Sequence, residues 1–168
     1  YDSIQTPAGK VDKTLGGSAN YFSLAASLFS SVRVVGVVGE DYAPADKDVL
    51  KQRKVDLSGL ETVPGKTFHW EGKYEGDLNE AKTLKTELNV FEHFNPKLPA
   101  GFTESPFVFL ANIAPELQLQ VLNQVKNPLF VGMDTMNFWI MSKKEALLKV
   151  LKKVDVILIN EGEADLLT

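Results

Sequence analysis

The stretch FVFLANIAPELQLQVLNQVKNPLFVGMD, residues 107–134, decides the fold because two apolar runs flank an amphipathic one. The apolar runs FVFLAN and LFVGMD have the length and composition of buried strands. The run between them, PELQLQVLNQVK, opens with Pro115, a residue favoured in a first helical turn, and predicts a helix. Farther along, SKKEALLKVLKK predicts a helix capped by Ser142, and VDVILIN predicts a third strand. This alternation predicts right-handed βαβ units, so we expect an α/β fold with a mainly parallel sheet flanked by helices.

The first half of the chain predicts elements of two kinds. VRVVGVV, residues 32–38, predicts a buried strand, and PADKDVLKQRKVD, residues 44–56, predicts a short polar helix. By contrast, TFHWEGKY and TLKTELNV, residues 67–74 and 83–90, alternate apolar and polar side chains, which predicts exposed antiparallel strands. We therefore expect two regions: an α/β core formed by residues 1–61 and 91–168, and a small β-sheet within residues 62–90.

The composition argues against several classes of function. The 168 residues carry a net charge of −4, which does not supply a basic face for nucleic acid. No apolar run approaches the roughly 18 residues that a membrane-spanning helix needs. The chain has no cysteine, so it forms no disulfide and no thiolate metal site, which suits a cytoplasmic protein. Its two histidines, His69 and His93, lie far apart in sequence, and we expect packing or surface roles for them rather than metal binding.

Polar residues end the three predicted strands of the second half. They are Asn112, Asp134 and Asn160. Because the carboxyl ends of parallel strands meet at one edge of a sheet, we expect these residues to line a crevice where a ligand binds. Asn and Asp also suit turns and helix caps, so each residue taken alone has an ordinary structural explanation.

Glu163 follows Asn160 by three residues, in the sequence NEGE. At a helix N-terminus this amide and carboxylate could hold a hydrated Mg²⁺ ion and, through it, a phosphate. The same spacing satisfies a capping box, in which the two residues bond only to each other's backbone. The sequence leaves both interpretations open.

GGSANYFSLAASLF, residues 16–29, places two glycines at the start of a predicted helix. Gly16 and Gly17 allow positive φ and close backbone approach, which suits a bound ligand and also an ordinary turn. Asn20 heads a polar stripe on this otherwise apolar helix. The chain has no G-x-G-x-x-G pattern opening a helix after a strand, which disfavours a Rossmann-type oxidoreductase.

Three aromatic residues in the first alternating segment are expected on one face of its strand. They are Phe68, Trp70 and Tyr74, with Gly72 between the last two. Aromatic side chains on an accessible sheet face indicate a covered surface, and either a partner chain or a bound ligand would cover this one.

Together these motifs resemble the ribokinase-like, or PfkB, family of carbohydrate kinases. The resemblance runs over essentially the whole chain: a strand ending at Asp2, then GGSAN, VVGVVGEDY, the insertion at 62–90, FLAN, MDTMNFW and LINEGEADLLT. It implies a mainly parallel sheet flanked by helices, with a small β-sheet lid that often joins two copies in a homodimer. It also implies transfer of the γ-phosphoryl group of ATP to a hydroxymethyl group of a sugar, a sugar phosphate or a nucleoside.

The resemblance also implies roles for single residues. Substrate hydroxyl groups would be contacted by Asp2 and Asn20, and Gly16 and Gly17 would pass close to the sugar. Asn112 would face the substrate, and Asp134 would face the substrate or the phosphate side. Asn160 and Glu163 match the family's N-x-x-E motif, which organises Mg²⁺ and the transferring phosphate.

One departure from the family limits these expectations. The family's Gly-Ala-Gly-Asp motif, which supplies the catalytic base and the amides that hold the anion, is absent from the sequence. The chain therefore resembles a piece truncated at both ends, and we expect these 168 residues alone to transfer no phosphate. A non-catalytic ligand-binding or regulatory module of the same fold is the alternative.

Overall fold

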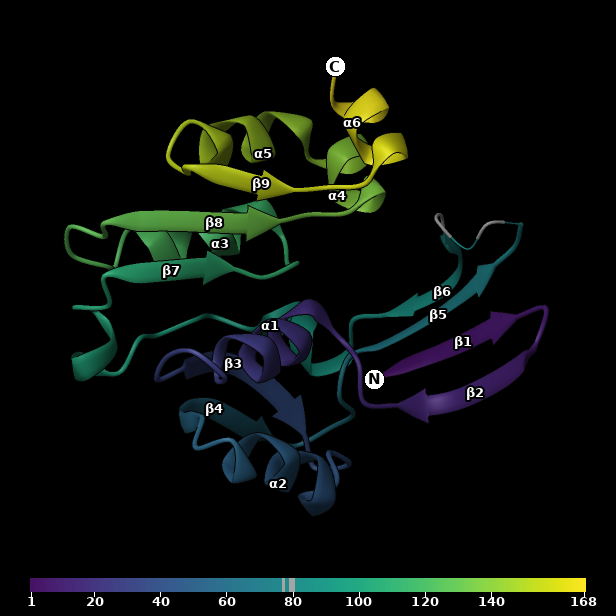
Figure 1. The fold of residues 1–168 in the computed structure, drawn as a ribbon, viewed down its shortest axis with the longest axis horizontal. Helices are drawn as coiled ribbons and strands as arrows, with labels where there is room; N and C mark the ends of the chain where they lie inside the picture. Colours follow the sequence, from purple (N-terminus) through teal and green to yellow (C-terminus); the bar gives the residue numbers. More distant parts are fainter. Residues whose placement is uncertain (77, 79–80) are drawn as a thin grey trace. The chain divides into compact units, whose positions relative to one another are not determined.

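The computed structural model describes residues 1–76, 78 and 81–168. The chain divides into two compact units, Tyr1–Phe94 and Asn95–Thr168. Each contains a parallel sheet flanked by helices (Figure 1). The predicted α/β class is therefore confirmed.

The first unit contains a two-stranded parallel sheet of β3 (Arg33–Gly39) and β4 (Asp56–Val63). The same unit contains two helices, α1 (Ser18–Ala26) and α2 (Pro44–Gln52). The helix predicted for residues 44–56 is wrong at its end, because α2 stops at Gln52 and Lys54 has a left-handed φ of 57°. A left-handed residue ends an α-helix, so the chain turns there and Asp56 begins β4, a strand that the sequence analysis missed.

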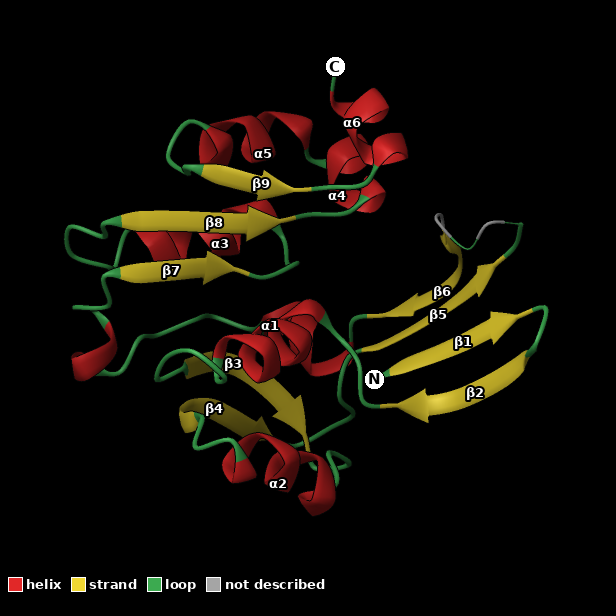
Figure 2. Cartoon of the chain, in the orientation of Figure 1, coloured by secondary structure: helices red, strands yellow, loops and turns green. Residues whose placement is uncertain are grey.

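The first unit also contains a four-stranded sheet in the order β2-β1-β5-β6. Its strands are β1 (Asp2–Thr6), β2 (Gly9–Thr14), β5 (His69–Tyr74) and β6 (Ala81–Glu87), drawn in yellow in Figure 2. Strand β1 runs antiparallel to β2 and parallel to β5, and β5 runs antiparallel to β6. The sequence predicted β5 and β6 but not the hairpin of β1 and β2, whose residues are mostly polar and, apart from the buried Ser3, partly or fully exposed. Asp2, expected at the end of a strand, is the first residue of β1.

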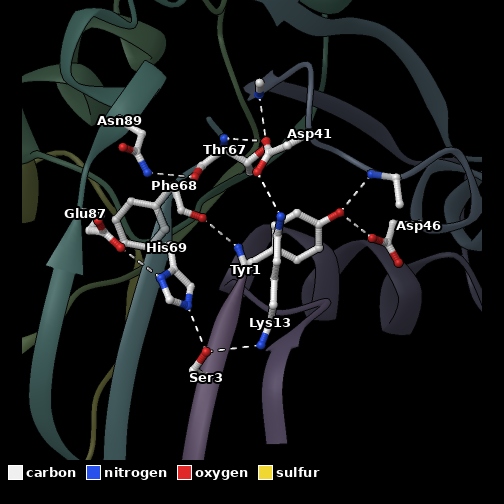
Figure 3. A network of polar contacts seen from close by, with 12 residues as sticks. Tyr1, Ser3, Lys13, Asp41, Asp46, Thr67, Phe68, His69, Glu87 and Asn89 are labelled. Carbon is white, nitrogen blue, oxygen red and sulfur yellow. Dashed lines mark hydrogen bonds and ion pairs between the residues drawn. The ribbon is translucent and has the colours of Figure 1, made fainter. Parts of the chain in front are cut away.

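A cluster that we call the Asp41 junction, consisting of Lys13, Asp41 and Thr67, joins the four-stranded sheet to the end of β3 (Figure 3). The backbone N–H and the hydroxyl of Thr67 both donate to Asp41 Oδ1 at 2.7 Å. Lys13 Nζ lies 3.0 Å from Asp41 Oδ2. Thr67 is buried, and its hydroxyl oxygen accepts from the N–H of Gly39 at 3.0 Å. The junction therefore satisfies polar groups where three chain segments meet.

The free energy of unfolding is expected to fall as the pH drops from 3.8 to about 2, partly because of Asp41. Burial alone would raise the pKa of this carboxyl, but hydrogen bonds from Thr67 and the charge of Lys13 lower it to about 2. A carboxyl with a lowered pKa stabilises the fold above its ordinary pKa and loses that contribution as the pH falls through the folded value. Urea unfolding across this pH range measures the slope. Asp41→Asn should flatten it, and an unchanged slope would contradict the account.

The second unit contains a three-stranded sheet with all strands parallel, in the order β7-β8-β9. Its strands are β7 (Phe107–Leu110), β8 (Phe130–Asp134) and β9 (Val156–Leu158). Helices α3 (Pro115–Leu122) and α5 (Lys144–Leu151) pack against it, and the strands and helices predicted for this half are confirmed. The core consists of buried apolar side chains from the sheet and its helices: Leu110, Leu122, Val131, Met133, Ile140, Leu147 and Val150.

The helix cap predicted at Ser142 is wrong. Ser142 is the last residue of α4 (Asn137–Ser142), a helix that was not predicted, and its hydroxyl donates to the carbonyl of Phe138 one turn back. Helix α5 begins at Lys144, and its N-cap residue, Lys143, makes no side-chain cap hydrogen bond. A serine hydroxyl that bonds back within its own helix is not available to the next one.

The remaining elements are short. Helix α6 (Glu161–Leu167) follows β9, and two 3₁₀ turns, η1 (Asn89–His93) and η2 (Ala100–Phe102), lie in the connection between β6 and β7. Within the part of the chain that the structure describes, no helix has the length and apolar content needed to cross a bilayer.

Candidate functional site

Asp2 lies against the turn that opens α1. Its Oδ2 accepts a hydrogen bond from the N–H of Gly17 at 3.3 Å. A Cβ added to Gly16 would lie only 1.9 Å from the same oxygen, so the Asp2 carboxylate occupies the space that a side chain at position 16 would need. Gly17 has a φ of 90°, a conformation that favours glycine. The two glycines therefore allow the backbone to approach the carboxylate.

Asn20 is held in the same place by the first turn of α1. Its Nδ2 donates to the carbonyl of Gly16 at 2.6 Å, and its side chain is also a hydrogen-bond partner of the Tyr42 hydroxyl. Burial, assisted by the charge of Asp46, raises the pKa of Tyr42 to about 12, which keeps this hydroxyl neutral. The structure thus brings together four of the predicted substrate residues: Asp2, Gly16, Gly17 and Asn20.

The pKa of Asp2 is governed mainly by its burial. Burial raises the pKa of Asp2, and the hydrogen bond from the Gly17 N–H opposes that rise. Burial also raises the pKa of Tyr74, with smaller contributions from the charges of Asp2 and Tyr21. A partly buried carboxylate that keeps unused lone pairs is a strong acceptor for hydroxyl donors. Tyr21, on α1, was not among the predicted residues, since an aromatic residue in an apolar helix indicates packing.

The three aromatic residues predicted for the lid divide into two groups. Trp70 and Tyr74 share one face of the strand, as predicted, and Asp2 is the register partner of Trp70 in the neighbouring strand. The Trp70 ring covers Gly72, where an added Cβ would lie 2.0 Å from the ring, and its Nε1 donates to the Thr83 hydroxyl at 3.1 Å. Phe68 precedes β5 and instead packs against Phe91 of η1, with 5.5 Å between ring centroids.

His69 lies in β5 between Trp70 and Phe68 and bonds to both neighbouring strands. Its Nε2 lies 2.8 Å from the Ser3 hydroxyl of β1, and its Nδ1 lies 3.1 Å from Glu87 Oε2 of β6. The Ser3 hydroxyl also donates to Asp12 Oδ1 at 2.7 Å. These bonds cross-link strands of the sheet, which is the packing role expected for this histidine.

The predicted strand-end residues follow the carboxyl ends of the second unit's sheet. Asp134 is the last residue of β8, and Asn112 and Asn160 each lie two residues beyond the end of β7 and β9. Because β7, β8 and β9 run parallel, these three residues belong to the same edge.

Gln118 joins two of these strand ends and was missed by the sequence analysis. Its side chain is buried, and its Nε2 lies 3.1 Å from each of the carbonyl oxygens of Leu110, Ala111 and Asp134. One amide on α3 thus bridges the ends of β7 and β8. The signal that could have found it is its helical spacing with Pro115 and Leu122, which are also buried.

Asn160 and Glu163 form a capping box at the start of α6. The Asn160 side chain accepts from the N–H of Glu163 at 2.9 Å, and Glu163 Oε2 accepts from the N–H of Asn160 at 3.1 Å. Partial burial raises the pKa of Glu163, and that hydrogen bond opposes the rise. Among residues 1–76, 78 and 81–168, no group of three or more His, Asp or Glu side chains is placed to hold a metal ion. Two side chains are fewer than a Mg²⁺ coordination shell needs, and at such sites water and substrate phosphates supply the remaining ligands.

Comparison with known proteins finds relatives along almost the whole chain. No protein-family profile matches it. A cytidine kinase from Thermococcus kodakarensis is 26% identical over 172 residues, which cover 99% of this chain and 60% of the relative. Ribokinase from Cryptococcus neoformans, solved with ADP, superposes with a TM-score of 0.73 at 19% identity, covering 99% of this chain and 57% of that one.

The chain has the ribokinase fold. The resemblance predicted from the sequence is therefore confirmed. A nucleoside kinase from Burkholderia thailandensis, solved with inosine, shares the ribokinase fold with a TM-score of 0.72 and 16% identity, over 99% of this chain and 59% of that one. The chain spans about 60% of the length of the curated relative, and the proteins that it resembles are nucleoside and sugar kinases.

Proposed function

We propose that this chain is the substrate-binding and lid part of a kinase that transfers the γ-phosphoryl group of ATP to a hydroxymethyl group of a nucleoside or sugar. The observation that carries the proposal is the Asp2 carboxylate, which lies against Gly16 and Gly17 with Asn20 beside it. Its support comes from the ribokinase fold and from the relatives, one a cytidine kinase and one solved with inosine.

In this proposal Asp2 accepts hydrogen bonds from substrate hydroxyl groups, because an ionised carboxylate offers more lone pairs than the one Gly17 N–H uses. The missing side chain at Gly16 makes room for the Asp2 carboxylate, and the missing side chain at Gly17, where an added Cβ would meet only Asn20 Nδ2 at 4.0 Å, would let a sugar ring approach the backbone. Asn20, held by the Gly16 carbonyl, would contact a hydroxyl group. The four-stranded sheet, rather than residues 62–90 alone, would form the lid, with Trp70 and Tyr74 facing the substrate. The lid would also join two copies in a homodimer.

A nucleoside is the substrate class that we favour over a simple sugar. The Trp70 ring is fixed over Gly72 by its bond to Thr83, and Tyr74 lies on the same face. Two flat side chains beside a carboxylate offer a stacking surface for a base and an acceptor for ribose hydroxyls. Sugars also stack on aromatic rings, so a test of the substrate class needs both nucleosides and sugars.

The second unit would serve the phosphate side. Asn112 and Asp134 would face the substrate and the transferring phosphate from the ends of β7 and β8. ATP is the proposed co-substrate, in keeping with the ADP in the ribokinase complex. When bound, Mg²⁺ would neutralise charge on the phosphates, and Asn160 and Glu163 would contribute to organising it.

Glu163→Gln separates the two roles proposed for α6. Glutamine keeps the oxygen that accepts from the Asn160 N–H, so the capping box and the free energy of unfolding should change little. Glu163→Ala removes that oxygen and should cost about 1 kcal/mol. If Glu163 also helps to organise Mg²⁺, Glu163→Gln shifts the Mg²⁺ dependence of phosphoryl transfer by the protein at its full length. An unchanged Mg²⁺ dependence in both variants would restrict Glu163 to capping.

The proposed function is tested by incubating the full-length protein with ATP and Mg²⁺ and a panel of nucleosides and sugars, with product detected by mass spectrometry. We expect one class of substrate to gain a phosphate. The 168 residues alone should give no product, since they lack the Gly-Ala-Gly-Asp motif. Saturable binding of a panel member without any product would instead support a non-catalytic ligand-binding module.

A further inference from the structure

Strand β1, which carries Asp2, lies between β2 and β5 in the four-stranded sheet. Asp2 is the register partner of Thr14 in β2 and of Trp70 in β5. The position of its carboxylate therefore depends on how those two flanking strands are anchored to the rest of the unit.

On the β2 side the anchor is Lys13, which occupies a β-bulge. The register shifts so that Asp12 and Lys13 together oppose Ser3, and Lys13 has a φ of 50°. The N–H of Lys13 donates to the Ser3 hydroxyl at 3.1 Å. A bulge of this kind re-aims the side chain of the extra residue. Here the Lys13 ammonium lies 3.0 Å from Asp41 Oδ2 and 5.1 Å from the centroid of the Tyr1 ring (Figure 3).

On the β5 side the anchor is Thr67, two residues before the strand. Its N–H and hydroxyl both bond to Asp41 Oδ1, and its carbonyl accepts from Asn89 Nδ2 at 3.0 Å. The hydroxyl oxygen also accepts from the Gly39 N–H at the end of β3. Figure 3 shows the Thr67 N–H, the Thr67 hydroxyl and the Lys13 ammonium all bonding to the Asp41 carboxylate.

We infer that Asp41 is a positioning residue for Asp2: one carboxylate at the end of the core strand β3 fixes both strands that flank β1. The inference rests on the proposed function for the role of Asp2 and goes beyond it by assigning Asp41 a part in substrate binding. Asp41 bonds to Lys13 and Thr67, so it acts on the substrate through the two strands. Hydrogen bonds to an ionised carboxylate are stronger than hydrogen bonds between neutral groups, so they suit a contact that holds two strands in place.

The kinetic test compares Asp41→Ala with Asp48→Ala in the full-length kinase. Asp48 is an exposed aspartate of α2 whose partner is Lys51, so it is a matched control away from the sheet. We expect Asp41→Ala to raise the substrate KM about tenfold or more while the KM for ATP stays unchanged. Asp41→Asn should have a smaller effect, because its Oδ1 still accepts from Thr67. Equal substrate KM values in a folded Asp41→Ala protein and in wild type would overturn the inference.

Hydrogen exchange of the chain tests the junction independently of activity. In Asp41→Ala, backbone amides of β1 and β2 should exchange about tenfold faster than in Asp48→Ala, as expected from losing hydrogen bonds to a charged group. Amides of β7 and β8 should not change. If wild type phosphorylates nothing, the proposed function fails, while the exchange rates still decide whether Asp41 anchors the hairpin. Unchanged rates would overturn the anchoring.

A second variant covers the case in which Asp41→Ala does not fold. Thr67→Val removes the hydroxyl that links Asp41 to Gly39 but keeps the side-chain volume, whereas Thr67→Ser keeps the hydroxyl. We expect Thr67→Val to accelerate exchange in β5 and raise the substrate KM, and Thr67→Ser to restore both. Failure of Thr67→Ser to restore either one would overturn the inference.

Discussion

Under the proposed function, Gly16→Ala is expected to lower kcat/KM for the nucleoside or sugar about a hundredfold in the full-length protein. The added Cβ would lie 1.9 Å from Asp2 Oδ2 and 2.4 Å from its Cγ, distances that no real contact allows. The Asp2 side chain can rotate away from the added Cβ, so we expect the fold to survive. The carboxylate is then lost from the position in which it would accept substrate hydroxyls.

The measurement is steady-state kinetics for both substrates, together with the melting temperature. Gly101→Ala is the matched control, because an added Cβ there meets nothing within 4 Å. We expect Gly16→Ala to leave the KM for ATP unchanged while kcat/KM for the nucleoside or sugar falls. A Gly16→Ala enzyme as active as Gly101→Ala would show that Asp2 has no role in substrate binding.

Gly39→Ala is expected to lower the free energy of unfolding of the chain by about 3 kcal/mol. An added Cβ would lie 2.3 Å from the Gly65 carbonyl oxygen and 2.6 Å from the Thr67 nitrogen. Both contacts are with backbone, which cannot move aside as a flexible side chain can. The substitution therefore pushes the segment before β5 away from β3 and strains the Asp41 junction.

Gly36→Ala, on the same strand, is the control for that prediction. Its nearest neighbour would be Leu60 Cδ1 at 3.5 Å, which is ordinary van der Waals contact. Urea unfolding of the two variants and wild type should therefore place Gly36→Ala close to wild type and Gly39→Ala well below it. Equal losses from the two substitutions would contradict the close packing at Gly39.

The elements that the sequence predicted are those in which apolar side chains recur with the period of a strand or of a helix. The second unit's strands and helices alternate in apolar content, and their core side chains pack as that pattern requires. Strands β1 and β2 have no such pattern, because their mostly polar side chains leave little periodic burial to recognise. A strand pair stabilised by side-chain hydrogen bonds, such as those of Ser3, carries no hydrophobic signature.

The residues of the candidate site also fall into two groups, those that the sequence indicates and those that it does not. Residues at turns and strand ends, such as Gly16 and Asp134, stand out in the sequence because their types suit those places. Asp41 and Gln118 act through partners far away in sequence, at positions 13, 67 and 134. An aspartate just beyond a strand, or a glutamine in a helix, has many ordinary explanations, and only the folded chain shows which groups it joins.

The proposed role of Asp2, with the glycine turn and Asn20, is to bind the substrate hydroxyl groups of a kinase. The most direct test is the KM of Asp2→Asn for the nucleoside or sugar and for ATP, measured on the full-length protein. Asparagine keeps the size of the side chain but loses its charge. We expect a substrate KM raised about tenfold or more with an unchanged KM for ATP. An unchanged substrate KM, or equal increases in both constants, would contradict it.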